Sequence, residues 1–177
     1  MFTNSKNQIE VIFSKSQTIK VRNEDLNILS INARKSLFNK SRFCCHKNAK
    51  DPLHEMIIFH KRDYYVRPHK HTHSSESIHI IKGKVDIFLF KNNGEILDII
   101  SMGDLQSNKI FYYRIKKNVY HSLFIKSPEL IFHETTLGPF MKKNTIFARW
   151  SPKNDFNKYK KNLNFKIKFY EKVFYKK

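Results

Sequence analysis

The sequence predicts an all-β fold, a sandwich or barrel of short strands, and three observations lead to it. Short apolar runs recur at spacings of about 8–12 residues through the middle of the chain. Turn residues such as Gly83 and the tripeptide Asn92-Asn93-Gly94 separate these runs. The chain has 177 residues, of which 40% are hydrophobic and 16 are Phe, enough for the core of one domain.

Residues 1–30 are expected to form an N-terminal lead-in. The alternation of Ile9, Val11 and Phe13 with other residues predicts a short strand, and Ile19 with Val21 predicts a second. The tripeptide Asn23-Glu24-Asp25 precedes an apolar stretch that ends at Ile31, which predicts a short helix capped by Asn or Asp.

Residues 31–152 carry the predicted main domain. Its apolar runs and alternating segments predict strands in this order: Met56–Phe59, Tyr64–Val66, Ile78–Ile81, Val85–Phe90, Ile96–Ile100, Ile110–Ile115, Tyr120–Ile125 and Leu130–Thr135.

Residues 153–177 differ from the rest, because lysines there alternate with aromatic and aliphatic side chains. Phe165, Phe169 and Val173 have helical spacing, whereas Phe165, Ile167 and Phe169 have the spacing of a strand. The spacing of the apolar residues does not decide between a helix and a strand. We expect this basic aromatic extension to pack its apolar side chains on the main domain. The alternative is a surface for anionic membrane or nucleic acid.

The net charge is high, since 34 Lys+Arg face 15 Asp+Glu and leave +19. Much of this surplus is lysine in a chain also rich in Asn, Ile and Phe, a set that AT-rich coding favours. A cation of this size attracts polyanions whatever its origin. No recognition motif for nucleic acid accompanies the charge, so nucleic acid or anionic membrane remains the secondary expectation for a partner.

The two cysteines, Cys44 and Cys45, are adjacent and have no other cysteine to pair with. A chain without disulfides fits a reducing compartment. No run approaches 18 apolar residues, and the N-terminal residues lack the pattern of a secretory signal. The sequence therefore predicts a cytoplasmic protein.

Histidines gather between residues 69 and 79. On a strand, His69 and His71 point to the same face, and Glu76 follows after a short excursion. His121, on a later predicted strand, is the expected fourth ligand. Three imidazoles and one carboxylate suit Mn, Fe, Co, Ni or Zn and leave positions open for water or substrate.

The spacing His69-x-His71-x4-Glu76-x6-Gly83 resembles the first signature motif of the cupin superfamily, and His121 ends a stretch that resembles the second. More narrowly, residues 30–152 resemble the WbuC-type cupin-fold metalloproteins. The matching residues are Ala33-Arg34, Arg42, His46, Asp51-Pro52, Tyr65 to His71, Glu76, Gly83, Glu134, Gly138-Pro139-Phe140 and Phe147-Ala148-Arg149-Trp150-Ser151-Pro152.

Two departures from the pattern bear on the site. The second motif lacks its usual Pro and Gly, and Asn118 is expected to make the turn because Asn tolerates the left-handed conformation. His73 creates a rival register, with His71 and His73 as the paired ligands. We favour His69 and His71, because Arg67-Pro68 fixes the frame of the resemblance.

The resemblance implies a cupin-type antiparallel β-barrel or jelly roll with a divalent transition metal at its mouth. It also implies an association with surface polysaccharide (O-antigen or capsule) biosynthesis. It implies no particular reaction, so whether the protein is an enzyme stays open.

Several polar residues are candidates for ligand binding. Arg67 shares strand parity with the paired histidines and should face the same space. The candidates for substrate binding are Arg34, Arg42, His46, Arg67 and Tyr113. Arginines there would recognise phosphate or carboxylate, or else pair with Asp or Glu.

The remaining titratable candidates are a carboxyl and three isolated histidines. Glu134 is the candidate catalytic acid-base, with pairing to an arginine or to a ligand histidine as the alternatives. We expect His54, His60 and His133 to be structural histidines with their hydrogen bonds satisfied.

Three functions of the metal site remain open, beside a fourth in which the protein binds nucleic acid through its charge alone. The first is a metal-dependent cupin that acts on a sugar or sugar-nucleotide intermediate. The second is a non-enzymatic, regulatory cupin that binds such a ligand, and the third is an Fe(II) dioxygenase-like enzyme. The expected partners are a small anionic or sugar ligand and a second copy of the chain, in a homodimer with exchanged N-terminal strands.

Overall fold

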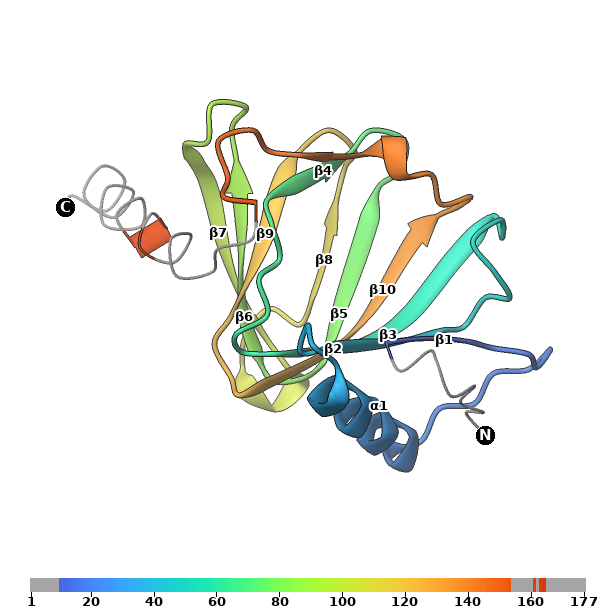
Figure 1. Cartoon of the computed structure of the whole chain (residues 1–177). Coiled ribbons are helices and arrows are strands. Elements are labelled where there is room, and N and C mark those ends of the chain that lie inside the picture. The colour runs from blue at the N-terminus through green and yellow to red at the C-terminus, as the bar shows by residue number, and fades with distance from the viewer. Residues whose placement is uncertain (1–9, 154–160, 162, 165–177) are drawn as a thin grey trace.

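The computed structural model describes residues 10–153, 161, 163 and 164, and these form two facing β-sheets with one α-helix (Figure 1). The first sheet has the strand order β1 (Val11–Phe13), β2 (Lys40–Cys44), β3 (Leu53–Lys61), β10 (Glu129–Leu137), β5 (Glu76–Lys82) and β8 (Tyr112–Ile115). The second has the order β11 (Thr145–Phe147), β4 (His69–His71), β9 (Tyr120–Ile125), β6 (Lys84–Phe90) and β7 (Ile96–Gly103). The helix α1 spans Asn23–Lys35, and two 3-10 turns span Leu105–Ser107 and Lys142–Asn144.

Strands that are distant in sequence lie side by side, as in a jelly roll. β10 lies between β3 and β5, and β9 lies between β4 and β6, in every case antiparallel. Only β1, which lies parallel to β2, departs from antiparallel pairing among the described strands. The antiparallel β-barrel or jelly roll predicted from the sequence is confirmed.

The main core fills the space between the sheets. Alternate residues of each strand face inward, as the pleat requires. The first sheet contributes Met56, Ile58, Ile78, Ile80, Leu130 and Phe132, and the second contributes Val85, Ile87, Met102, Leu123 and Ile125. This apolar layer fixes the register of the strands that carry the polar site, because a slip of one residue would turn the layer outward.

The helix α1 covers the outer face of the first sheet. Leu29 and Ala33 are fully buried there against a second cluster that includes Ile57 and Phe59. The run Met56–Phe59 is therefore apolar throughout because both of its faces are covered, one by α1 and one by the opposite sheet.

The start of α1 corrects one prediction. The N-cap is Arg22, whose backbone N–H donates to the carboxylate of Asp25 at 2.8 Å. An Asn or Asp residue was expected at the N-cap position itself, but Asp25 lies inside the first turn and its side chain accepts the hydrogen bond from there. It satisfies an N–H group that would otherwise have no partner.

Two predicted strands are absent from the described chain. Ile19 and Val21 lie in an irregular segment before α1, where Ile19 packs against the helix cluster as a single side chain. Tyr64–Val66 follow a turn closed by the Tyr64 N–H and the Lys61 carbonyl at 2.9 Å, and their backbone pairs with no strand. Apolar alternation over two or three residues does not guarantee strand pairing.

A third apolar cluster covers the outer face of the second sheet. Phe88, Phe90 and Tyr120 contact Ala148 and Leu163 there. Most of the basic aromatic extension, including Phe165, Ile167, Phe169 and Val173, lies outside the described residues. Within the described residues, no helix is long and apolar enough to cross a membrane.

Candidate metal centre

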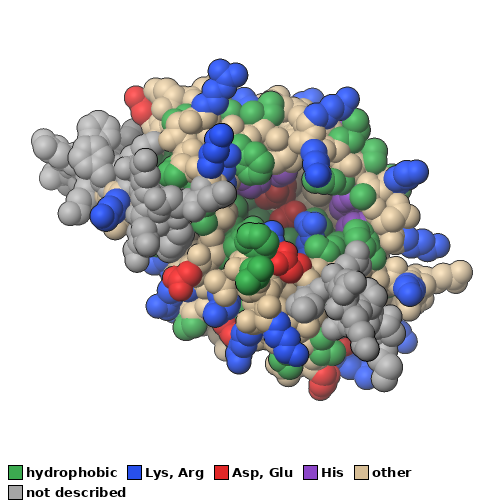
Figure 2. Space-filling view, in the orientation of Figure 1, with side chains coloured by type: hydrophobic (Ala, Val, Ile, Leu, Met, Phe, Trp, Pro, Cys, Tyr) green, Lys and Arg blue, Asp and Glu red, His purple; other side chains and the backbone are tan. Residues whose placement is uncertain are grey.

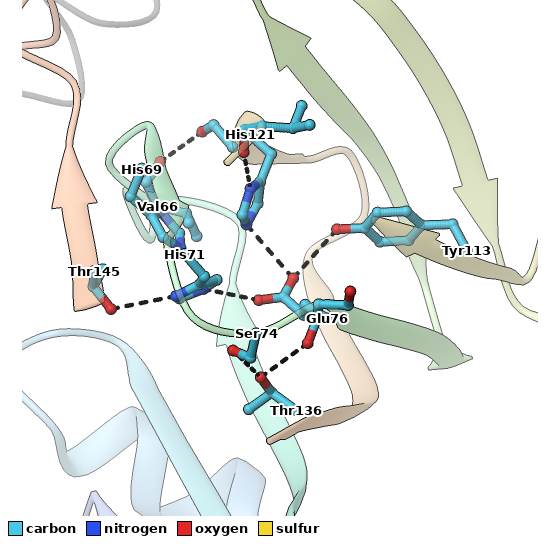
Figure 3. A network of polar contacts seen from close by, with 12 residues as sticks. Val66, His69, His71, Ser74, Glu76, Tyr113, His121, Thr136 and Thr145 are labelled. Carbon is cyan, nitrogen blue, oxygen red and sulfur yellow. Dashed lines mark hydrogen bonds and ion pairs between the residues drawn. The ribbon is translucent and has the colours of Figure 1, made fainter. Parts of the chain in front are cut away.

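Three histidines and one glutamate meet between the two sheets (Figure 3). Their nearest ligand atoms all lie within 4.8 Å of one another. His69 and His71 come from β4, Glu76 begins β5, and His121 lies on β9. The four residues are the predicted quartet, drawn from two separated segments of the chain.

The local backbone explains why the histidines converge. β4 has three residues, so His69 and His71 at its two ends share a face. His69 pairs directly with His121 on β9, and their ring centroids are 4.5 Å apart. Asn118 adopts φ 68° in the turn before β9, and its N–H donates to the His71 carbonyl at 2.7 Å. Asn118 thus makes the turn predicted for it.

Backbone carbonyls orient two of the rings. A carbonyl oxygen only accepts, so Nδ1 of His69 donates to Arg67 O at 2.8 Å, and Nδ1 of His121 donates to Val119 O at 3.1 Å. This tautomer leaves the lone pair of each Nε2 available to a metal. Nε2 of His121 is buried and has no hydrogen-bond partner in the part of the chain that the structure describes.

The carboxylate of Glu76 lies between two rings. Its Oε2 is 3.1 Å from Nε2 of His71, and its Oε1 is 3.6 Å from Nε2 of His121. Tyr113 donates its hydroxyl to Oε1 at 3.3 Å, and Thr145 lies 3.3 Å from Nδ1 of His71 (Figure 3). Outer contacts of this kind hold ligand side chains in position.

Burial and charge set the protonation of the cluster. Burial alone would raise the pKa of Glu76, but the imidazoles of His121 and His71 outweigh it and hold this pKa well below its usual value. Burial, together with His121, lowers the pKa of His69 to about 3. Burial alone would lower the pKa of His121, yet the Glu76 carboxylate raises it. Glu76 is therefore ionised and His69 neutral, the forms in which both act as ligands.

The chemistry of the quartet fits a divalent transition metal. Ligands about 2.0–2.2 Å from one centre lie about 3–4 Å from each other, which the spacing of the four ligand atoms allows. Nε2 of His121 makes no hydrogen bond among the described residues and lies 3.6 Å from the Glu76 carboxylate, so a cation between the two would satisfy both groups in this buried place. A site of three imidazoles with one carboxylate suits Mn, Fe, Co, Ni or Zn.

A cavity of about 590 Å³ adjoins the quartet. Inner-face residues of β1, β2, β3 and β10 line one side, and β4 with the segment 139–147 lines the other. In Figure 2, histidine and acidic side chains lie in a hollow whose edge carries hydrophobic and basic side chains. The edge includes Leu137, Pro139, Phe140, Met141 and Phe147. A ligand at the quartet would thus have polar groups beneath it and an apolar rim around it.

The structure places the predicted ligand-binding residues in two groups. Arg42, His46 and Glu134 line the cavity. Tyr113 does not line it, and instead packs in the main core and holds Glu76.

Two of the predicted arginines also lie outside the cavity lining. Arg34 is on the surface with its Nη2 3.0 Å from Glu129 Oε1. Arg67 donates to Ser151 Oγ at 3.0 Å and Ala148 O at 3.1 Å and lies over the ring of Phe147. Arg67 thus ties the segment 147–151 to the end of β4.

Glu134 is the third acidic residue of the cavity, with Glu10 and Glu76. Burial, with the Glu76 carboxylate, raises the pKa of Glu134 well above its usual value, and Arg42 offsets only part of this. Glu134 and Phe132 both lie on the inner face of β10.

Two histidines correct the prediction of satisfied hydrogen bonds. Both residues line the cavity, and Nε2 of His54 and Nδ1 of His60 are buried without a hydrogen-bond partner among residues 10–153, 161, 163 and 164. His54 stacks on His46 with ring centroids 4.0 Å apart. The alternation of β3 could have predicted that these histidines point inward, because His54 and His60 share the parity of the inward Met56 and Ile58. His133 lies on the outer face, with Nε2 3.8 Å from Glu55.

Comparisons with known proteins add the following. Residues 21–102, a little under half of the chain, match the model of a domain of unknown function, DUF6016. No curated protein matches the chain.

Among solved structures, oxalate decarboxylase from Bacillus subtilis is similar with 16% identity and a TM-score of 0.46, over 55% of this chain and 24% of that one. Protein SO0799 from Shewanella oneidensis is similar with 11% identity and a TM-score of 0.46, over 55% of this chain and 63% of that one. CapF, solved with the inhibitor 3-isopropenyl-tropolone, is similar with 15% identity and a TM-score of 0.48, over 62% and 31%.

Each match spans less than two thirds of the other protein. What these proteins bind or catalyse is therefore not transferred to this chain. The jelly roll and the quartet between its sheets are established by this chain's own structure. Together they form a jelly roll that holds a candidate metal site between its sheets.

Proposed function

We propose that this protein binds one divalent transition metal at His69, His71, Glu76 and His121 and uses the metal to hold a small anionic or sugar ligand in the adjoining cavity. One observation carries the proposal: three imidazoles and a carboxylate converge at the wall of a cavity of about 590 Å³. Four protein ligands leave coordination positions open in a metal that prefers five or six. The cavity is where an incoming ligand would reach them.

The chemistry that such a metal supplies is Lewis acidity toward a carbonyl or hydroxyl oxygen. The chain's own residues supply the rest. Tyr113 keeps the Glu76 carboxylate oriented, and the carbonyls of Arg67 and Val119 keep two imidazoles in the ligating tautomer. Glu134, with its raised pKa, is suited to hold a proton and give it to a ligand in the cavity.

We assign the ligand to surface polysaccharide biosynthesis, as a sugar or sugar-nucleotide intermediate. The support is the resemblance to WbuC-type proteins, carried by Arg67-Pro68-His69-x-His71 and by Phe147-Ala148-x-Trp150-x-Pro152. In the structure these two segments lie together, since β11 pairs with β4 and the Ala148 N–H donates to Pro68 O at 2.9 Å. The homodimer and the cytoplasmic location remain predictions.

The test combines turnover and binding. Metal-loaded protein is incubated with a panel of nucleotide-linked keto sugars, with ¹H NMR to detect product and calorimetry to detect binding. Turnover that disappears in His121→Ala and persists in His79→Ala, a histidine outside the cavity lining, supports a metal-dependent enzyme. Binding with the same dependence but no product supports the regulatory cupin, and oxygen uptake with an Fe(II) requirement supports the dioxygenase. A panel that gives neither binding nor product contradicts the assignment to sugar ligands.

A further inference from the structure

Two basic side chains lie in the cavity apart from the metal quartet. Lys40 and Arg42 both line the cavity from β2. Lys40, Arg42 and Cys44 follow one another at intervals of two residues, so they lie on the same face of β2. Cys44 belongs to the main core between the sheets. Both side chains therefore extend from the inner face of the first sheet.

Among the described residues, no carboxylate forms an ion pair with Lys40 or Arg42. Glu134 lies near enough for Arg42 to lower its pKa, but burial and the Glu76 carboxylate outweigh this effect and favour the uncharged form of Glu134. The Glu10 carboxylate accepts a hydrogen bond from the Ser36 hydroxyl at 2.7 Å.

The other contacts of Lys40 are not with anions. Its Nζ lies 3.4 Å from the Tyr64 hydroxyl and 5.3 Å from the centroid of that ring. The basic pair is thus available to an anion in the cavity.

The strand register sets the separation between this pair and the metal quartet. Arg42 lies opposite Ile58, and Ile58 lies opposite Phe132, whereas Glu76 lies opposite Thr136 on the same strand, β10. The four residues from Phe132 to Thr136 and the three strand spacings from β2 to β5 place the Cα atoms of Arg42 and Glu76 about 15–20 Å apart. Both side chains extend into the cavity and shorten this span, so the separation favours an elongated ligand over a compact one.

We propose that Arg42, assisted by Lys40, forms a phosphate-binding subsite in the cavity, separate from the metal quartet, so that the ligand is an elongated phosphorylated molecule of the sugar-phosphate class. Two cationic groups suit the two charges of a phosphoryl group, and a guanidinium binds phosphate through two parallel hydrogen bonds. The statement about the metal-facing end of the ligand rests on the proposed function, whereas the phosphate subsite itself does not.

The first experiment measures orthophosphate binding to metal-free protein by calorimetry. The variants are Arg42→Gln and Lys40→Met. The matched control is Arg34→Gln, which removes the same charge outside the cavity. We expect Arg42→Gln to weaken phosphate binding about 10- to 100-fold, the usual worth of charge-assisted hydrogen bonds. Lys40→Met should weaken it less, and Arg34→Gln should leave it unchanged.

Three results would overturn the subsite. They are an equal affinity in Arg42→Gln and Arg34→Gln, no phosphate binding to the wild-type protein, and acetate binding as tight as that of phosphate. The last would show a general carboxylate site. Circular dichroism of each variant confirms that the fold is retained.

The second experiment tests the separation of the two ends. Manganese-loaded protein is saturated with oxalate, a short metal chelator, and then titrated with orthophosphate. Independent sites predict an unchanged phosphate affinity, whereas competition would show one shared site. Elemental analysis of the same samples keeps the two proposals apart: protein that binds phosphate through Arg42 but no metal contradicts the proposed function and leaves the subsite intact.

Discussion

The Glu76 carboxylate lies 3.1 Å from Nε2 of His71, the nitrogen that also faces the centre of the quartet. Both groups therefore present to each other the atoms with which they would bind a cation. In the metal-free protein, the hydrogen bond between the Glu76 carboxylate and the His71 imidazole keeps these two ligand side chains close together. The site is therefore largely formed before a metal binds, and the metal would take the place of the shared hydrogen.

Removing the charge of Glu76 should weaken metal binding most. Glu76→Gln keeps the size of the side chain but loses the only anionic ligand. We expect metal affinity to fall by more than about 100-fold, beyond the 10- to 100-fold typical of outer contacts. Competition with a chromophoric chelator measures it. Glu129→Gln is the control at an acidic residue that pairs with Arg34 on the surface, and equal affinities of the two variants would refute the role of Glu76.

The register of the histidines can be tested with two alanine variants. His69→Ala should lose metal binding, because His69 is within the quartet and lies beside His121. His73→Ala should retain it, because His73 is exposed and does not belong to the quartet. Metal content after gel filtration gives the answer, and the reverse pattern would establish the rival register.

The hydroxyl of Tyr113 should contribute through Glu76. Tyr113→Phe removes the 3.3 Å hydrogen bond to Glu76 Oε1 and little else. Metal affinity should fall about tenfold, at the low end for an outer contact. Tyr112→Phe, at the exposed neighbouring position, should have no effect. A Tyr113→Phe protein with wild-type affinity would show that the hydrogen bond does not orient the ligand.

Metal binding should release protons and weaken in acid. The Glu76 carboxylate raises the pKa of His121 above its usual 6.5, so a proton already competes with the metal for this imidazole at pH values above 6.5 and competes more strongly below it. Metal affinity should therefore increase as pH rises from about 5.5 to 8. Calorimetry in two buffers of different ionisation enthalpy counts the protons released. An affinity that does not change over this range would contradict the assignment of His121 as a ligand.

His60 should make the metal-free protein sensitive to acid. Burial, reinforced by Lys40 and Arg42, lowers the pKa of His60 from 6.5 to about 3. Below pH 6.5 the unfolded chain binds a proton at this histidine, whereas the folded protein does not. The contribution of His60 to the free energy of unfolding is therefore complete above pH 6.5 and is lost as pH falls toward 3. His60→Gln should flatten the decline in unfolding free energy between these values, leaving the parallel contribution of His69.

Urea denaturation at several pH values measures this slope. His73→Gln, at an exposed position, is the control and should keep the wild-type slope. A His60→Gln protein with an unchanged slope would show that His60 takes up protons in the folded state.

The sequence predicted those parts of the protein that alternate strongly or have a fixed ligand spacing. β6, β9 and β10 lie where apolar alternation placed them, and the quartet assembles as its spacing indicated. β2 and β11 were missed because Lys40–Cys44 and Thr145–Phe147 are short and partly polar. Their pairing is decided by the partner strands β3 and β4, which the local pattern does not contain.

The polar interior of the cavity was the hardest part to predict. Arg34, Arg42 and Arg67 look alike in sequence, yet only Arg42 lines the cavity. The difference lies in tertiary partners, Glu129 for Arg34 and the segment 148–151 for Arg67. Sequence spacing gives the parity of a side chain on its strand, but it does not say which distant segment the side chain meets.

The most direct test of the metal centre is a crystal structure of manganese-loaded protein with anomalous diffraction collected at the metal edge. We predict one strong anomalous peak per chain, about 2.0–2.2 Å from Nε2 of His69, His71 and His121 and from an oxygen of Glu76. A peak elsewhere in the chain, or four side chains turned away from a common point in metal-loaded protein, would contradict the account.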